Sequence, residues 1–77
     1  GIEAVLHYSR RSARAFLDAA RDEGVEISAL AIPHCCLSAT VASVLRDAGA
    51  SQVLVAETPD ENALFGTLER ALRTRLA

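Results

Sequence analysis

Apolar residues gather in three short runs along the chain, at residues 4–8, 34–37 and 52–56. None of these runs alternates apolar with polar positions in the way that a strand with one solvent-facing side does. A short continuous apolar run bounded by turn residues is typical of a strand covered on both faces. The pattern therefore predicts three strands, near residues 4–8, 34–37 and 52–56.

The segments after the first two runs carry apolar stripes with helical spacing. Ser9 and Ser38 are suited to cap the starts of these two predicted helices, and Gly24 and Gly49 are suited to their C-terminal ends. The stripes comprise Ala13, Phe16, Leu17 and Ala20 in the first helix, and Val41, Val44, Leu45 and Ala48 in the second.

A third helix is predicted after the last apolar run by a strong start signal. Thr58 is expected to cap it, Pro59 to occupy the first helical position and Glu61 to complete a capping box. Its stripe is the longest in the chain and comprises Leu64, Leu68, Ala71, Leu72 and Leu76.

Residues 25–33 fit either a strand or a helical turn, although Pro33 favours an extended conformation at Ile32. The other elements follow the order β-α-β-α-β-α. Short connections in that order predict a parallel sheet with right-handed crossovers in a three-layer α/β fold. Three strands are few for such a sheet, and the chain opens at Gly1 rather than Met. We therefore expect a fragment of a longer protein.

Composition narrows the class of protein. Apolar residues make up 51% and charged residues 23% of the 77 residues, which is typical of a soluble globular chain. No apolar run approaches the roughly 18 residues of a membrane span, and no signal peptide is visible. A net charge of −2 and 4% aromatic residues argue against nucleic-acid binding. All eight basic residues are Arg, which fits a GC-rich, bacterial genome.

The two cysteines, Cys35 and Cys36, are adjacent, so a disulfide between them would be strained. Reduced thiols and a cytoplasmic location are therefore expected. Successive strand residues point to opposite faces of a sheet, so these thiols do not share a metal ion. His7 and His34 are interpreted as structural residues, since the sequence places no carboxylate to orient either ring.

The candidate chemistry lies where the predicted strands end, because ligands of open parallel sheets bind beyond the carboxyl ends of the strands. The third helix start carries its own acids, Asp60 and Glu61. The first carries Arg10, Arg11 and Arg14 instead, an arrangement that favours an anion. An Arg14–Asp18 ion pair is the alternative explanation for that charge placement.

The second helix start is uncharged, and Ser38 and Thr40 could bind a carboxylate or phosphate or serve only at the helix start. No glycine-rich nucleotide loop is present, and no Arg follows Cys35 or Cys36 by six residues as a cysteine-phosphatase loop requires. No catalytic residue can be assigned from these positions.

Three segments resemble, in order and spacing, the C-terminal section of uroporphyrinogen-III synthase. The first is a strand that ends in an aromatic-Ser step and leads into a helix with a Phe, at residues 4–16. The second is a strand–loop–helix unit at residues 36–49. The third, at residues 55–64, is a strand followed by a Thr-Pro helix start and an Ala-Leu pair.

This resemblance implies an enzyme of two flavodoxin-like lobes. Residues 1–77 would be the C-terminal part of one lobe, without its N-terminal strand or strands and without the second lobe. The family cyclises hydroxymethylbilane to uroporphyrinogen III, with inversion of the D ring and loss of water, and uses no metal or cofactor. The fragment alone would be inactive.

The family holds its polycarboxylate substrate largely through backbone N–H and hydroxyl groups. The resemblance assigns Ser9 to the first loop and Thr40 to the first Thr of a Gly-x-Thr-Thr loop, where Ser38 replaces Gly and Val41 the second Thr. The expected substrate-binding residues are Ser9, Arg10, Ser12, Ser38 and Thr40, with hydroxymethylbilane as ligand.

An unpaired sheet edge is expected to pair with the missing part of the parent chain or with a second copy, as a sheet-paired or swapped dimer. The alternative function is a non-catalytic α/β ligand-binding or interaction domain of response-regulator type. Such a domain needs an Asp at a strand end, whereas the strands here end in Tyr8, Leu37 and Ala56.

Overall fold

Three parallel strands form the centre of the structure, a computed structural model that describes residues 4–76. They are β1 (Val5–His7), β2 (His34–Cys36) and β3 (Val53–Val55), in the spatial order β1-β2-β3. His7, Cys36 and Val55 lie in one row across the sheet. The predicted parallel sheet is confirmed, and each strand is a little shorter than the apolar run that predicted it.

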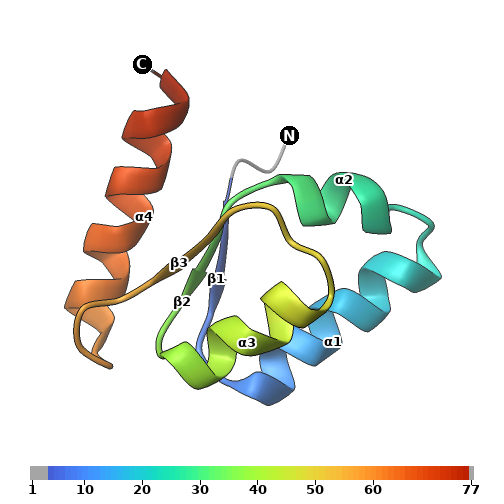
Figure 1. The fold of residues 1–77 in the computed structure, drawn as a ribbon, viewed down its shortest axis with the longest axis horizontal. Coiled ribbons are helices and arrows are strands. Elements are labelled where there is room, and N and C mark those ends of the chain that lie inside the picture. The colour runs from blue at the N-terminus through green and yellow to red at the C-terminus, as the bar shows by residue number, and fades with distance from the viewer. Residues whose placement is uncertain (1–3, 77) are drawn as a thin grey trace.

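Four helices accompany the sheet among the described residues (Figure 1): α1 (Arg10–Asp22), α2 (Glu26–Ala31), α3 (Ala39–Asp47) and α4 (Glu61–Leu76). Helices α1 and α3 cover one face of the sheet and α4 covers the other, which gives three layers. None of the described helices combines the length and the apolar character that a bilayer crossing requires.

Each face of the sheet has its own core, because successive strand residues point to opposite sides. Cys36 packs with α1 and α3, in a cluster completed by Ala13, Leu17, Val41, Ala42 and Leu45. Cys35 packs with α4, in a cluster completed by Ala56, Leu64 and Ala71. The two adjacent cysteines are both buried, and both are free thiols, in agreement with the sequence prediction of reduced cysteines.

The predicted apolar stripes account for most of the buried helical positions. Phe16 and Val44 are half-buried beside their fully buried neighbours, while Ala48 is exposed and Ala42 takes its place in the core. On α4, Leu64 and Ala71 are buried and Leu68 and Leu72 half-buried. The side chain of Leu76 lies outside the described residues.

The ends of α1 and α3 follow the sequence prediction. Ser9 and Ser38 are the N-cap residues, and both have extended backbone dihedrals. Gly24 and Gly49 follow the C-caps with φ of +74° and +98°. These angles lie in the left-handed region, which glycine enters without the clash that a Cβ atom causes.

The start of α4 differs from the prediction. Asp60, rather than Thr58, occupies the cap position: its carboxylate accepts a hydrogen bond from Ala63 N at 2.8 Å, and its carbonyl accepts one from Leu64 N at 3.1 Å. The Thr58 hydroxyl donates to the Asp60 carboxylate and, among the described residues, accepts no hydrogen bond from a backbone N–H as a cap would. Pro59 therefore precedes the cap, and Glu61 is the first helical residue rather than the end of a capping box.

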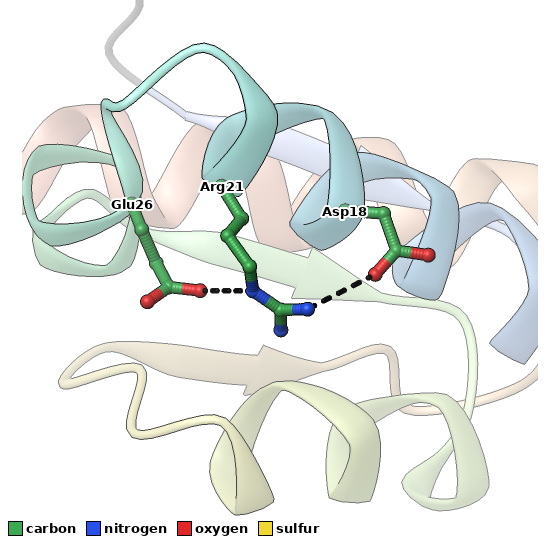
Figure 2. Close-up of polar contacts among 3 residues, drawn as sticks. All are labelled: Asp18, Arg21 and Glu26. Carbon is green, nitrogen blue, oxygen red and sulfur yellow. Dashed lines mark hydrogen bonds and ion pairs between the residues drawn. The ribbon is translucent and has the colours of Figure 1, made fainter.

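Residues 25–33 contain the short helix α2, so the element order is β-α-α-β-α-β-α rather than β-α-β-α-β-α. Val25 N bonds to Ala20 O at 2.9 Å after the left-handed turn at Gly24, and α2 begins there without a side-chain cap. Ile32 is extended before Pro33, as predicted. Arg21 pairs with Asp18 in the same helix and with Glu26 of α2, and the second ion pair joins the two helices (Figure 2).

Candidate functional site at the carboxyl edge of the sheet

The carboxyl ends of the three strands bring three chain segments side by side. Leu37 N donates to His7 O at 3.0 Å, and Ala56 N donates to Cys36 O at 2.9 Å, so the pairing continues one residue past the strands. Since His7, Cys36 and Val55 share one row, the residues two positions further occupy equivalent places. Those residues are Ser9, Ser38 and Glu57.

The first segment is closed by two serines that cap each other. Ser9 Oγ accepts from Ser12 N at 3.1 Å, and Ser12 Oγ accepts from Ser9 N at 3.1 Å. The hydroxyl of Ser12 also donates to Ser9 O at 2.9 Å. This reciprocal arrangement leaves the N–H groups of Arg10 and Arg11 as the first-turn donors that no described group satisfies.

The second segment is more open. Ser38 Oγ accepts a long hydrogen bond of 3.4 Å from Val41 N, and Ser38 O accepts from Ala42 N at 3.0 Å. Thr40 is exposed, and within the described part of the chain its hydroxyl makes no hydrogen bond. Of the five predicted site residues, Thr40 is the one whose hydroxyl is available to a ligand in full.

Three arginines line a shallow hollow on the N-terminal half of α1, together with Ala15 and Asp18. They are Arg10, Arg11 and Arg14, all exposed. The alternative explanation for this charge placement, an Arg14–Asp18 ion pair, does not form among the described residues, where Asp18 pairs with Arg21 at 3.8 Å. Arg21 lies one turn further along α1 and is drawn toward α2 by Glu26, at 3.3 Å (Figure 2).

The third segment has the opposite charge. Glu57 pairs with Arg70 at 3.5 Å, and Asp60 and Glu61 stand at the start of α4. The hydrogen bond from Thr58 and those from backbone N–H groups lower the pKa of the Asp60 carboxyl, which is therefore ionised at neutral pH. An anion at this edge of the sheet is consequently favoured near α1 and α3 and disfavoured near α4.

The buried titratable groups next to this edge are held in their neutral forms. Burial and the neighbouring His34 lower the pKa of His7 from 6.5 to about 4. Burial raises the pKa of both thiols, that of Cys36 to about 11. Neutral, enclosed thiols are poor nucleophiles, so Cys35 and Cys36 are core residues of the fold.

Metal ligation has no evident basis within residues 4–76, where no three His, Cys, Asp or Glu side chains converge on one point. His7 Nε2 and His34 Nδ1 contact each other at 3.0 Å, and both residues are buried, which agrees with their interpretation as structural residues. The groups that this edge offers to an anion are N–H donors, the hydroxyl of Thr40 and guanidinium groups.

The structure brings the five predicted site residues to the starts of two neighbouring helices. Ser9, Ser12 and Ser38 act as caps there, while Arg10 and Thr40 face solvent. Arg11 and Arg14 join Arg10 around the hollow, although they are absent from the predicted set. The sequence does indicate this grouping, since Arg14 follows Arg10 by four residues and Arg11 by three, and residues with these spacings lie on one face of a helix.

Comparison with protein families gives one match. The family model described as uroporphyrinogen-III synthase HemD matches residues 1–66. Neither the curated proteins nor the solved structures contain a match to this chain. The matched residues include all three strands and the starts of α1 and α3. The chain therefore belongs to the uroporphyrinogen-III synthase family.

Proposed function

We propose that this chain is part of an enzyme that cyclises hydroxymethylbilane to uroporphyrinogen III, with inversion of the D ring and loss of water. The observation that carries the proposal is the family match over residues 1–66. The cytoplasm is the compartment proposed for it, in keeping with two free, buried thiols.

We further propose that residues 1–77 form the C-terminal part of one flavodoxin-like lobe of a two-lobed protein. A doubly wound sheet of flavodoxin type has strand order 2-1-3-4-5. Its last three strands run consecutively across the sheet, as β1, β2 and β3 do here. The helices between these strands lie on one face and the final helix lies on the other, which is also the arrangement of α1, α3 and α4.

The proposed substrate-binding site comprises Ser9, Arg10, Ser12, Ser38 and Thr40. A linear tetrapyrrole with carboxylate side chains needs several separate anion contacts. The unsatisfied N–H groups at the starts of α1 and α3 and the guanidinium of Arg10 offer them. Ser9 and Ser12 contribute by holding the first turn of α1 open, since their own hydroxyls are engaged in the cap. The catalytic acid stays unassigned.

The direct test is an activity assay on the full-length protein. Purified enzyme with hydroxymethylbilane should produce the type III isomer, identified by chromatography of the oxidised porphyrins. Residues 1–77 alone should be inactive, because the proposed cleft needs both lobes. A full-length protein that folds but forms no type III isomer would refute the proposed reaction.

Thr40→Val tests the proposed substrate-binding site in the full-length enzyme. If Thr40 holds a substrate carboxylate in the ground state, the variant should raise KM more than it lowers kcat. The loss of one hydrogen bond to a charged group costs about 1.5–3 kcal/mol, or roughly a tenfold to hundredfold rise in KM. Steady-state kinetics with hydroxymethylbilane measure both constants.

Two controls accompany Thr40→Val. Thr40→Ser keeps the hydroxyl and should stay near the parent enzyme. Ser43→Ala removes an exposed hydroxyl one turn further along α3, where it donates to Thr40 O, and should leave both constants unchanged. Equal losses in kcat and kcat/KM for Thr40→Val would instead indicate a contact made only in the transition state. Unchanged values of KM and kcat would mean that Thr40 does not contact the substrate.

A further inference from the structure

Three neighbouring arginines on α1 have no partner within the described part of the chain. Arg10, Arg11 and Arg14 are exposed, and none of their side chains forms an ion pair or a hydrogen bond there. The ion pairs of the structure engage other arginines, namely Arg21, Arg70 and Arg73. Three guanidinium groups on the N-terminal half of α1 are therefore available to a ligand.

This placement of charge opposes the stability of the helix. Arg14 follows Arg10 by four residues and Arg11 by three, so the three like charges stand on one face, where they repel one another. The first turn of α1 contains no acidic residue, although the macrodipole favours a negative charge there. The chain as a whole carries a net charge of −2, so a positive surface is not its general property. A local arrangement that opposes stability in this way is expected at functional sites.

The hollow that these arginines line has room for more than one carboxylate. Its volume is about 590 Å³, which is in the range of small-molecule sites, and Ala15 contributes only a methyl group to the lining. One acid, Asp18, also lines the hollow, and its carboxylate is paired with Arg21 at 3.8 Å (Figure 2). Three positive charges thus accompany one negative charge that already has a partner.

The number and spacing of the guanidinium groups indicate which anions the hollow binds best. Each guanidinium is planar and can donate two parallel hydrogen bonds to one carboxylate. Arg10 and Arg14 are separated by about 6 Å along the helix axis, the rise of four residues. A ligand with several carboxylates can engage more than one of the three groups at once, whereas a monocarboxylate cannot gain from this second contact.

We propose that Arg11 and Arg14 extend the proposed substrate-binding site along α1, where they bind a second carboxylate of the same ligand and so select polycarboxylates over monocarboxylates. Arg10 connects the two parts, because it is the first residue of α1 and also lines the hollow. The identity of the natural ligand, hydroxymethylbilane, rests on the proposed function, whereas the preference of the hollow for a polycarboxylate does not.

Isothermal titration calorimetry on the full-length protein tests this preference without catalysis. At low ionic strength, mellitate, a benzene ring with six carboxylates, should bind more tightly than benzoate, which has one. Arg11→Gln and Arg14→Gln should each weaken mellitate binding about two- to fivefold, the range of one exposed ion pair. The difference from the parent protein should disappear in about 0.5 M NaCl, because salt screens exposed charges. Equal affinities for mellitate and benzoate would overturn the proposal.

Arg46→Gln is the matched control. Arg46 is exposed in the last turn of α3, at the other end of that helix from the carboxyl edge of the sheet, so the variant removes the same charge away from the hollow. It should leave mellitate affinity unchanged, and equal weakening by Arg46→Gln would show a general effect of charge and contradict the proposal. Neither Arg11→Gln nor Arg14→Gln should lower the midpoint of urea unfolding, because each removes a repulsive charge from α1. A lower midpoint would assign that side chain to the fold instead.

Steady-state kinetics separate this inference from the proposed reaction. With hydroxymethylbilane, Arg11→Gln and Arg14→Gln should raise KM and leave kcat near that of the parent enzyme, because a side-chain carboxylate takes no part in the ring closure. An enzyme that forms the type III isomer with unchanged KM in both variants would overturn the inference and leave the reaction standing. A protein that binds mellitate through these arginines but forms no type III isomer would refute the reaction and leave the preference for polycarboxylates standing.

Discussion

At the scale of single residues, the start of α4 shows which of two neighbouring residues caps a helix. Thr58 and Asp60 are both suited to cap a helix, and the sequence pattern favours Thr58. The chain uses Asp60, which accepts from Ala63 N, and the Thr58 hydroxyl supports the carboxylate. A negative charge at a helix N-terminus is also favoured by the macrodipole, whereas a hydroxyl contributes no charge.

Replacement of Asp60 should therefore affect stability more than replacement of Thr58. We expect Asp60→Ala to lower the midpoint of urea unfolding at pH 7, and Thr58→Val to lower it less. Because the pKa of Asp60 is lowered in the folded state, its contribution is present above the ordinary carboxyl pKa and is lost as the pH falls. Asp60→Asn keeps a cap without that loss. A larger fall in the unfolding midpoint for Thr58→Val than for Asp60→Ala would mean that Thr58 is the cap residue.

At the scale of elements, the sequence predicts what is locally encoded. The caps Ser9 and Ser38 are predictable because a cap needs only its own first turn, and the strands are predictable because their apolar runs are short and bounded. The sequence does not distinguish helix α2 from a strand, since six residues are too few to show a period and the carbonyls at the end of α2 bond to Ser51, Gln52 and His34. The contact between His7 and His34 depends on strand register, which a single sequence does not reveal.

Replacement of Gly24 and of Gly66 by Ala should change the free energy of unfolding in opposite directions. Gly24 turns the chain from α1 to α2 at φ +74°, and nothing lies within 4 Å of an added Cβ atom. Gly24→Ala should thus cost only the left-handed backbone, about 1–2 kcal/mol. Gly66, inside α4, has equally open space and no positive φ. Gly66→Ala should stabilise the protein by about 0.5–1 kcal/mol.

Urea unfolding of the two variants beside the parent protein measures both changes. Because neither methyl group meets a neighbour, the difference between the two reports backbone conformation rather than packing. Destabilisation by Gly66→Ala would mean that α4 does not run unbroken through this position. A neutral Gly24→Ala would mean that the turn adopts another conformation.

At the scale of the whole molecule, the sheet is unevenly covered. Helix α4 packs over β2 and β3, and within the described residues β1 is paired on one side, with β2. Leu6 and Leu54 are half-buried on the α4 face. An unpaired edge beside half-covered apolar side chains is a template for another strand. The proposed partner is the remainder of the lobe, or a second copy of the chain where residues 1–77 stand alone.

Residues 1–77 alone should consequently associate through β1. We expect the mass from light scattering to rise with concentration, and Ala4→Lys, beside β1, to suppress the rise because a charge on an edge strand opposes pairing. Ala15→Lys adds the same charge on the exposed surface of α1 and should leave association unchanged. A constant monomeric mass, or equal suppression by both variants, would exclude this edge as the site of association.

The placement of Cys35 and Cys36 on opposite faces has a practical consequence for measuring motion. Each thiol is 0% exposed, Cys35 beneath α4 and Cys36 beneath α1 and α3. A thiol reagent reaches either sulfur only when the layer above it lifts away. With the other cysteine changed to Ala, the rate of labelling at each position reports how fast the helix layer above that thiol opens. Two neighbouring residues thus allow the separate opening of both sides of the sheet to be timed in one small protein.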